Sequence, residues 1–311
     1  TIICTEYNIK VISKYQIYFL YLTKTYKKIP LGVRCKLLAT LSFSLMKVLV
    51  KYIPSIPTIE IVFFRAIISM ILSLVYLLPK KIAVFGNKKG LLAARGVMGA
   101  IALILNYYLL HKIPLAAAST LTNLTPIFTT LIGVYLVKEK IQSAQIAFFV
   151  LSFVGILIIQ GFDTRVSGIH LFLGILASFF SGIAYNLVRK LSSTEHPLVI
   201  MFYFPLVVLP ISLMGSLWSW ITPKGWDWFN LLMVGVTTQM AQYFMTKSYQ
   251  QAKVSKVAIF DYLGVVYALI FGFILFNEYF NLLTYLGIAL VLIGIISVSY
   301  THLTLPTNRE V

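Results

Sequence analysis

Asp261 is an acidic residue inside an otherwise apolar stretch of the sequence, residues 254–276. A carboxylate within a membrane span costs about 2.5 to 3.5 kcal/mol on insertion scales, so it needs a counter-charge, a proton or water. With Tyr262 beside it, Asp261 could exchange a proton or bind a cationic group of a substrate. Alternatively, it could form a structural ion pair with Lys247 or Lys256. The sequence leaves both roles open.

Two basic residues also lie within apolar stretches. Arg65 belongs to the segment 58–78 and Lys47 to the segment 36–53. Together they could bind an anionic group such as a carboxylate, because guanidinium groups form strong paired hydrogen bonds with carboxylate oxygens. In the structural alternative, Arg65 pairs with Glu60 and Lys47 extends to the membrane surface. We expect a functional role for Arg65 and a structural one for Lys47.

Polar residues recur along one face of the segment 114–137. Their helical spacing predicts a polar stripe, which would face a cavity or another helix rather than lipid. Pro126 in this stripe frees a backbone carbonyl that could bind substrate or act as a hinge. The structural alternative is hydrogen bonding between helices, at about 0.6 kcal/mol per bond. The stripe consists of Ser119, Thr122, Asn123, Pro126 and Thr130.

Shorter polar faces in other apolar segments extend this candidate cavity. Arg95 and Asn106 share one face of the segment 90–110, and Thr238 and Gln242 lie four residues apart in the segment 227–249. Asp261 is the candidate for coupling transport to a proton gradient. The full set of predicted cavity residues is Arg65, Asn106, Thr122, Asn123, Pro126, Tyr185, Thr238, Gln242, Asp261 and Tyr262.

Residues that could form a catalytic or metal centre are scattered. The histidines His111, His170 and His196 fall in separate loops, and His302 lies in the C-terminal tail. The two cysteines have no CxxC spacing, and the chain has no GxxxxGK[ST] motif for a nucleoside triphosphate. The sequence therefore predicts no catalytic residue, metal or cofactor. The alternative function, a membrane-embedded lipid-modifying enzyme, would need such a cluster.

The composition shows what must position these residues. Hydrophobic residues make up 59% of the 311 residues and charged residues only 11%, against about 25% charged in a soluble domain. The net charge of +17 would suggest nucleic acid in a soluble protein. Here the basic residues flank apolar segments, where they meet anionic lipid head groups. The composition therefore predicts a membrane protein that binds lipid and no nucleic acid.

Ten apolar segments are long enough, at about 20 residues each, to cross the hydrocarbon core as helices. Prolines, glycines and charges separate them. The predicted spans are residues 36–53, 58–78, 90–110, 114–137, 141–160, 168–189, 197–221, 227–249, 254–276 and 281–300.

Lys and Arg residues gather at alternate ends of these spans. If the N-terminus is cytoplasmic, the outer ends carry only Lys51, Lys112, Arg165 and Lys224. Because cytoplasmic loops are enriched in basic residues, this bias predicts that both termini face the cytoplasm. We expect the chain to lie in the cytoplasmic (inner) membrane.

The chain also contains an internal repeat. A shift of 139 residues superposes the segment 109–160 on the second half, and a shift of 138 aligns the first helices of the two halves. Each half holds five helices, an odd number, so the second copy enters the membrane inverted, as in many secondary transporters. The matched pairs include Leu124 with Leu263, Gly133 with Gly272, Glu139 with Glu278, and Gly155 with Gly294.

The predicted organisation follows from this repeat. The first repeat covers residues 32–165 and the second covers residues 166–300. Residues 1–31 are expected to form a cytoplasmic or interfacial extension. Residues 301–311 form a polar tail that is not expected to continue the last helix and is typical of a non-native end.

An ordered set of short sequences resembles a known family. In the first half these are Glu60-Ile-Val-Phe-Phe-Arg65, the stretch from Leu115 to Pro126, and Lys138-Glu139-Lys140. In the second half they are the stretches from Gly174 to Lys190 and from Phe276 to Glu278, followed by Gly287 and Gly294. The set, over residues 32–300, resembles the EamA type of the drug/metabolite transporter superfamily. The resemblance implies two five-helix repeats and a carrier of amino acids, metabolites or drugs. The chain differs from the family pattern at Val265, where the family has proline. It also differs at Tyr203, the repeat position equivalent to Arg65, which is a tyrosine and not an arginine.

The sequence thus predicts an all-α integral membrane protein of about ten transmembrane helices in two inverted five-helix repeats. The predicted function is a secondary transporter that moves a small metabolite by alternating access, the substrate being an amino acid, an amphipathic metabolite or a drug-like compound. The predicted cavity lies between helices one to four and six to nine. The expected partners are that substrate and membrane lipid, and a second copy of the chain is a further candidate.

Overall fold

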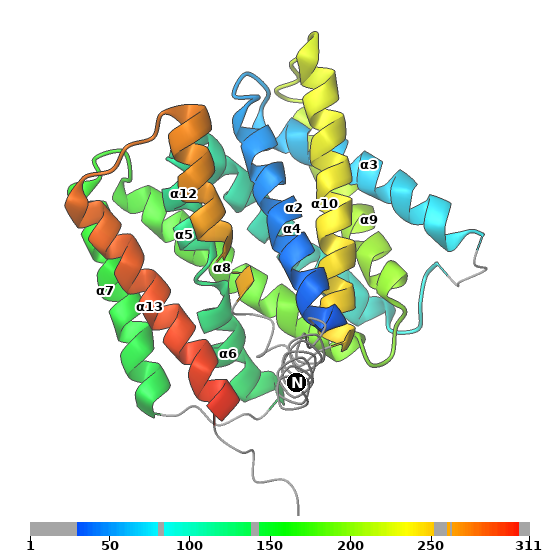
Figure 1. Cartoon of the computed structure of the whole chain (residues 1–311). Helices are drawn as coiled ribbons and strands as arrows, with labels where there is room; N and C mark the ends of the chain where they lie inside the picture. The colour runs from blue at the N-terminus through cyan, green and yellow to red at the C-terminus, as the bar shows by residue number, and fades with distance from the viewer. Residues whose placement is uncertain (1–29, 80–83, 138–142, 252–259, 262, 305–311) are drawn as a thin grey trace, which may run out of the picture.

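The structure is a computed structural model that describes residues 30–79, 84–137, 143–251, 260–261 and 263–304. Within this part of the chain, helices are the only regular secondary structure, which confirms the predicted all-α class (Figure 1). The helices are α2 (Leu31–Lys51), α3 (Thr58–Leu77), α4 (Lys89–Lys112), α5 (Leu115–Thr122), α6 (Thr125–Val137), α7 (Ser143–Phe162), α8 (Gly168–Leu191), α9 (Pro197–Ser216), α10 (Trp226–Gln251), α12 (Leu263–Phe276) and α13 (Leu282–Thr304).

These helices form the predicted ten spans, because α5 and α6 are two parts of one span. Among the described residues, five spans are long and apolar enough on their own to cross a membrane, and three shorter apolar helices accompany them. The remaining helix of the first half, α2, carries Lys36 and Lys47, which lower its apolar character. The chain is therefore a multi-pass α-helical membrane protein.

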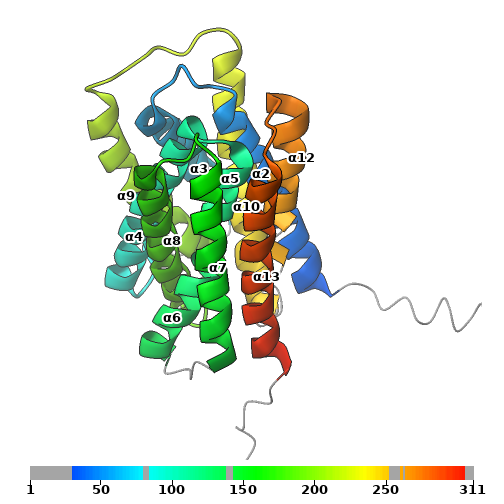
Figure 2. The same ribbon diagram turned by 90° about the vertical axis from the view of Figure 1, so that its left-hand side faces the viewer.

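Both ends of the described chain lie at the same end of the bundle. α2 begins and α13 finishes there, as Figures 1 and 2 show. We call this end the terminal side and the opposite end the distal side. An even number of spans produces this arrangement.

The structure differs from the predicted spans in three places, two helix ends and one internal break. The predicted span 197–221 ends as α9 at Ser216, and the backbone N–H of Ile221 donates to the Glu60 carboxylate instead of continuing a helix. α13 runs to Thr304, four residues into the predicted polar tail. Polar residues such as threonine cost a helix well under about 1 kcal/mol each, so a helix leaving the lipid can continue through them. The third difference is a break in the fourth span.

The break lies between α5 and α6, and Pro126 explains it. Proline has no N–H, so it cannot donate to the carbonyl of Thr122 four residues earlier. The hydroxyl of Thr125 donates to that carbonyl at 2.7 Å instead. On the neighbouring helix, the hydroxyl of Ser178 donates to the carbonyl of Leu121 at 2.7 Å. The carbonyl groups that end α5 are therefore satisfied within the protein.

The two halves pack mainly against each other rather than each against itself. α2 packs along α10, and its repeat mate α8 packs along α4. The contact of α4 with α9 is likewise mirrored by that of α10 with α3, and α7 pairs with its own mate α13. Exchanging the halves leaves this set of contacts unchanged, as expected for two halves related by a two-fold axis, and the odd number of helices in each half makes the repeat inverted.

Two equivalent hydrogen bonds, one from each half, show the same symmetry in atomic detail. The Ser178 hydroxyl bonds the carbonyl of Leu121, and the Thr40 hydroxyl bonds the carbonyl of Phe260 at 3.2 Å. Ser178 follows Thr40 by 138 residues and Phe260 follows Leu121 by 139, which are the two shifts found in the sequence. The first helix of each half therefore supports the fourth helix of the other half, at the point where that helix is interrupted or begins.

Candidate functional site

Two arginines meet around one aromatic ring inside the bundle. Arg65 on α3 and Arg95 on α4 are 3% and 4% exposed. Their guanidinium carbons lie 5.1 and 4.5 Å from the centroid of the Phe204 ring, which α9 of the second half supplies. A cation on an aromatic face gains electrostatic stabilisation, which increases when both are desolvated. Phe204 therefore holds both guanidinium groups in place.

The sequence around Arg95 makes room for this arrangement. A side chain on Gly99 would lie 2.7 Å from the Phe204 ring and 3.8 Å from the Arg95 guanidinium. Gly96, one turn before, lets α4 approach the backbone of Tyr203 on α9. Only glycine permits such close packing of α4 and α9 at these two positions, so the helix crossing and the arginine position are linked.

Neither arginine has the partner that its charge requires. The Nε and Nη1 atoms of both side chains are buried without a hydrogen-bond partner. The expected alternative, an ion pair of Arg65 with Glu60, is wrong: the Glu60 carboxylate instead accepts the backbone N–H of Ile221 at 3.0 Å. The two guanidinium groups also lie against the same aromatic ring, so two positive charges share one small region. The site is therefore strongly positive.

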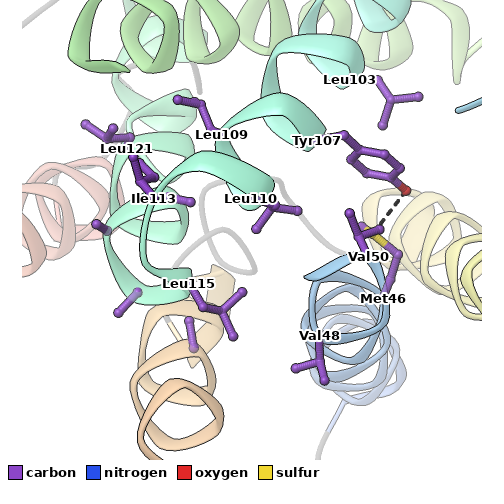
Figure 3. Packing of buried hydrophobic residues seen from close by; sticks show 14 of the residues in the cluster. Met46, Val48, Val50, Leu103, Tyr107, Leu109, Leu110, Ile113, Leu115 and Leu121 are labelled. Carbon is purple, nitrogen blue, oxygen red and sulfur yellow. Dashed lines mark hydrogen bonds between the residues drawn. The ribbon is translucent and has the colours of Figure 1, made fainter. Parts of the chain in front are cut away.

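Tyrosines complete the surroundings of the arginines. The Tyr107 ring lies 5.7 Å from the Arg65 guanidinium carbon, and its hydroxyl donates to the sulfur of Met46 at 3.1 Å (Figure 3). Tyr185 on α8 lies in the same region of the interior as both arginines. The predicted candidates Arg65 and Tyr185 thus lie in one region, together with Arg95.

Asp261 has a different partner from those expected. Its carboxylate forms a 2.8 Å ion pair with Lys36, which is 1% exposed. The predicted alternative through Lys247 is wrong, since the Lys247 ammonium faces the Tyr243 ring at 5.6 Å, and Lys256 lies outside the described residues. Lys36 also donates to the hydroxyl of Tyr249 at 3.0 Å. Lys36 lies on the buried face of α2, from which its side chain reaches Asp261.

This ion pair adjoins the arginine region. The ring centroid of Tyr249, which binds Lys36, lies 6.5 Å from that of Tyr185, which lies near the arginines. Lys47, expected to extend to the surface, instead points inward and donates to the Ser119 hydroxyl at 3.2 Å. The reason is that Lys47 lies on the face of α2 opposite the exposed residues Leu38, Leu41 and Leu45, so its side chain is directed into the bundle. Lys47 also interacts electrostatically with Asp261.

The remaining candidates are polar groups of the interior. Thr122 donates its hydroxyl to the carbonyl of Ser119 at 3.1 Å. Pro126 leaves no free carbonyl for a substrate, because Thr125 occupies it. The Tyr262 residue and the side chain of Thr130 lie outside the described part. Buried polar atoms without a hydrogen-bond partner occur on Asn106, Asn123, Thr238 and Gln242.

A separate ion pair closes the distal side. Lys51 at the end of α2 lies 2.8 Å from Oε1 of Glu278, which follows α12. Both carboxylate oxygens of Glu278 accept the backbone N–H of Leu115, at 3.0 and 2.8 Å, at the start of α5. A carboxylate at a helix N-terminus is stabilised by the unpaired N–H groups there. Glu278 therefore joins the two halves.

A hollow of about 700 Å³ opens near this same side. Its walls come from the α2–α3 connection, the start of α3 and the end of α4, and none of the predicted cavity residues lines it. The lining residues are Pro54, Ser55, Ile56, Pro57, Thr58, Ile59, Ile104, Tyr108, His111 and Lys112.

Sequence reasoning missed Lys36, Phe204 and Tyr249 as site residues. Lys36 was available as a cation within the first apolar helix, a signal that resembles that of Lys47. Phe204 and Tyr249 carry no signal of their own, because aromatic residues are common in apolar spans.

Known proteins resemble this chain along most of its length. The model of the EamA-like transporter family matches residues 30–161 and again residues 168–300. The pseudopaline exporter CntI of Pseudomonas aeruginosa (strain UCBPP-PA14) is 32% identical over 276 residues, which cover 87% of this chain and 96% of the exporter. Solute carrier family 35 member G1 of Homo sapiens is 30% identical over 274 residues, which cover 81% and 75% of the two chains.

More distant proteins match as well. The S-adenosylmethionine uptake transporter of Rickettsia prowazekii is 23% identical over 279 residues, covering 87% of this chain and 93% of that transporter. A crystal structure of 14% sequence identity superposes with a TM-score of 0.65, over 88% of this chain and 99% of the other. This last likeness shows a shared fold.

Proposed function

Because the chain belongs to the EamA-like transporter family, we propose that it is a secondary carrier that moves a small metabolite by alternating access of its two halves. Membership of this family makes the chain a transporter and not an enzyme, so the lipid-modifying alternative is set aside. The proposal concerns how the chain transports and what kind of molecule it moves.

One observation carries the proposal. α2 of the first half is joined to the second half by an ion pair near each end, Lys36 with Asp261 and Lys51 with Glu278. Asp261 precedes α12 and Glu278 follows it, so both pairs link the same two elements at opposite ends. A carrier that opens one side at a time must break one of these connections while it keeps the other. Two interleaved halves around a fixed central site are suited to this motion.

The interior supports a polar substrate of small size. Buried polar atoms without partners lie on residues of α4, α10 and the α5–α6 break, which include the predicted candidates Asn106, Asn123, Thr238 and Gln242. Relatives of this chain are named for small metabolites, among them a pseudopaline exporter and riboflavin and S-adenosylmethionine transporters. Those names include both export and uptake, so the proposal covers transport without a fixed direction.

Location and coupling are part of the same proposal. We place the carrier in the cytoplasmic membrane with both termini in the cytoplasm, on the basis of the basic residues at alternate helix ends. Asp261 is the coupling residue of this proposal, since it is a carboxylate that connects the halves and is 27% exposed. The terminal side, which holds Asp261 and Lys36, would then be the cytoplasmic side.

Cross-linking tests alternating access directly. In a background with Cys4 and Cys35 replaced by serine, the paired variants Lys36→Cys/Asp261→Cys and Lys51→Cys/Glu278→Cys are reconstituted in proteoliposomes. A bifunctional methanethiosulfonate reagent, which joins the two thiols through disulfide bonds, should stop counterflow of a substrate found by screening a metabolite panel, and a reductant that cleaves these bonds should restore it. The counterflow of each paired variant before cross-linking is the baseline for comparison.

A local cross-link serves as the control. Ser167→Cys/His170→Cys joins residues that already contact each other at the start of α8, 3.1 Å apart, within one half. This cross-link should leave counterflow unchanged. Undiminished counterflow with either inter-half pair fully cross-linked would contradict alternating access.

A further inference from the structure

The strongest unexplained feature of the interior is a pair of buried positive charges without counter-charges. Arg65 and Arg95 come from adjacent helices of the first half, and both lie against Phe204 from the second half. Each is more than nine-tenths buried, and each has two guanidinium nitrogens without a hydrogen-bond partner. Buried charges in proteins are normally paired, and charged residues within membrane spans are functional candidates by default.

None of the described acids is a counter-charge of the two arginines, although Oε1 of Glu60 is itself buried without a hydrogen-bond partner. Each of them binds a lysine, an arginine or backbone N–H groups, and none of them forms an ion pair with Arg65 or Arg95. The engaged acids are Glu60 with Ile221, Asp163 with Arg165, Glu195 with Asn87 and Lys88, Asp227 with Lys224, Asp261 with Lys36, and Glu278 with Lys51.

We propose that Arg65 and Arg95 together bind the acidic group or groups of the transported metabolite, so that the carrier selects a multiply charged anion. This inference rests on the proposed function. The chemistry is that of guanidinium groups, whose planar N–H donors match carboxylate and phosphate oxygens. The two guanidinium carbons lie 5.1 and 4.5 Å from one Phe204 ring centroid, so the empty site gathers two positive charges, and a ligand with two negative charges would neutralise both.

The neighbours of the arginines fit the same ligand. Tyr185 lies in the same region as both guanidinium groups, and a phenol can donate a hydrogen bond to an anion. The Phe204 ring fixes the direction of both guanidinium groups and supplies apolar surface beside the charge. A neutral or cationic ligand would leave both arginines unpaired, so this site discriminates against such ligands.

The ligand class can be tested on the purified full chain with defined probes. Binding of succinate, inorganic phosphate and succinamide is measured by the shift in melting temperature and by isothermal titration. Succinamide has the shape of succinate without its charges. We expect succinate or phosphate to bind and succinamide not to bind. Stronger binding of succinate would assign a carboxylate ligand, and stronger binding of phosphate a phosphate ligand.

Variants of the arginines separate binding from folding. Arg65→Gln and Arg95→Gln should each weaken anion binding by at least about tenfold. Arg65→Lys and Arg95→Lys should bind more weakly than the wild type but more strongly than the glutamine variants, because lysine keeps the charge and lacks the paired donors. Lys190→Gln, which removes an exposed charge at the end of α8, should bind as the wild type does. Without ligand, the two glutamine variants should melt no lower than the wild type, because they remove an unpaired buried charge.

Two outcomes would overturn the inference. One is full anion affinity in Arg95→Gln or Arg65→Gln. The other is a carrier that transports neutral or cationic metabolites and binds neither succinate nor phosphate, a result that would leave the proposed carrier function intact. Conversely, arginine-dependent anion binding together with undiminished counterflow across both inter-half cross-links would keep this inference and contradict alternating access.

Discussion

Lys36 and Asp261 form a 2.8 Å ion pair between the first helix of one half and the segment that precedes α12 in the other. Lys36 is 1% exposed and Asp261 is 27% exposed, so the lysine depends on this carboxylate more than the carboxylate depends on it. The pair also includes Tyr249, which accepts a hydrogen bond from Lys36 at 3.0 Å. These three residues connect α2, α10 and the segment before α12 near the terminal side of the bundle.

Removal of Asp261 alone should destabilise the protein. Asp261→Asn leaves Lys36 as an uncompensated buried charge, at a cost of about 3 to 5 kcal/mol. Thermal melting of the purified protein should show the loss, and Lys36→Met in the same chain should reverse most of it. Lys247→Met is the matched control and should not rescue, because Lys247 contacts Tyr243 rather than Asp261. Rescue by Lys247→Met instead would refute the observed pairing.

Coupling through Asp261 predicts a distinct transport defect. The double variant Asp261→Asn/Lys36→Met, which should fold, is expected to exchange substrate across proteoliposomes but not to accumulate it in response to a pH gradient. The reason is that it keeps the packing and lacks the titratable carboxylate. Gradient-driven accumulation equal to that of the wild type would exclude Asp261 as the coupling residue.

The break in the fourth span should depend on Thr125. Thr125→Val removes the hydroxyl that satisfies the carbonyl of Thr122, and an unsatisfied buried carbonyl costs about 1 to 3 kcal/mol. Pro126→Ala restores a backbone N–H at the same place, so the double variant should regain most of the stability. Additive losses in a double-mutant cycle of melting curves would show that the two residues act independently.

Two glycines should be essential for the contact between α7 and α13. A side chain on Gly155 would lie 2.7 Å from the carbonyl oxygen of Gly287, and one on Gly287 would lie 2.8 Å from that of Gly155. We expect Gly155→Ala to lower stability by about 1 to 3 kcal/mol, because backbone atoms cannot move aside as a flexible side chain can. Gly90→Ala is the control. It meets no atom within 4 Å and should be neutral or slightly stabilising.

The membrane orientation can be measured with a reporter fusion. A reporter that is active only outside the cytoplasm, joined after Val298 in α13, should stay inactive, because the basic residues predict a cytoplasmic C-terminus. The same reporter joined after Lys224, between α9 and α10, should be active. Strong activity after Val298 would reject this orientation.

The sequence alone was sufficient to predict the fold class, the ten spans and the inverted repeat. The thickness of the hydrocarbon core imposes a local requirement, about 20 apolar residues per helix, so each span can be recognised from its own residues. The shifts of 138 and 139 residues recur in the structure as the equivalent hydrogen bonds of Ser178 and Thr40. The sequence indicated that Pro126 frees a backbone carbonyl, but it predicted neither the break in the fourth span nor the hydroxyl of Thr125 that satisfies this carbonyl.

Only the tertiary structure decided which charged groups meet. Asp261 pairs with Lys36, which is far away in the sequence, rather than with Lys247, and Glu60 binds Ile221 instead of Arg65. The physical reason is that the halves interleave, so that α2 lies along α10 and α4 along α8. The counter-charges of Asp261 and Glu278 therefore come from the other half, and helical spacing within one span carries no information about them. The same interleaving brings Phe204 of the second half against both Arg65 and Arg95 of the first.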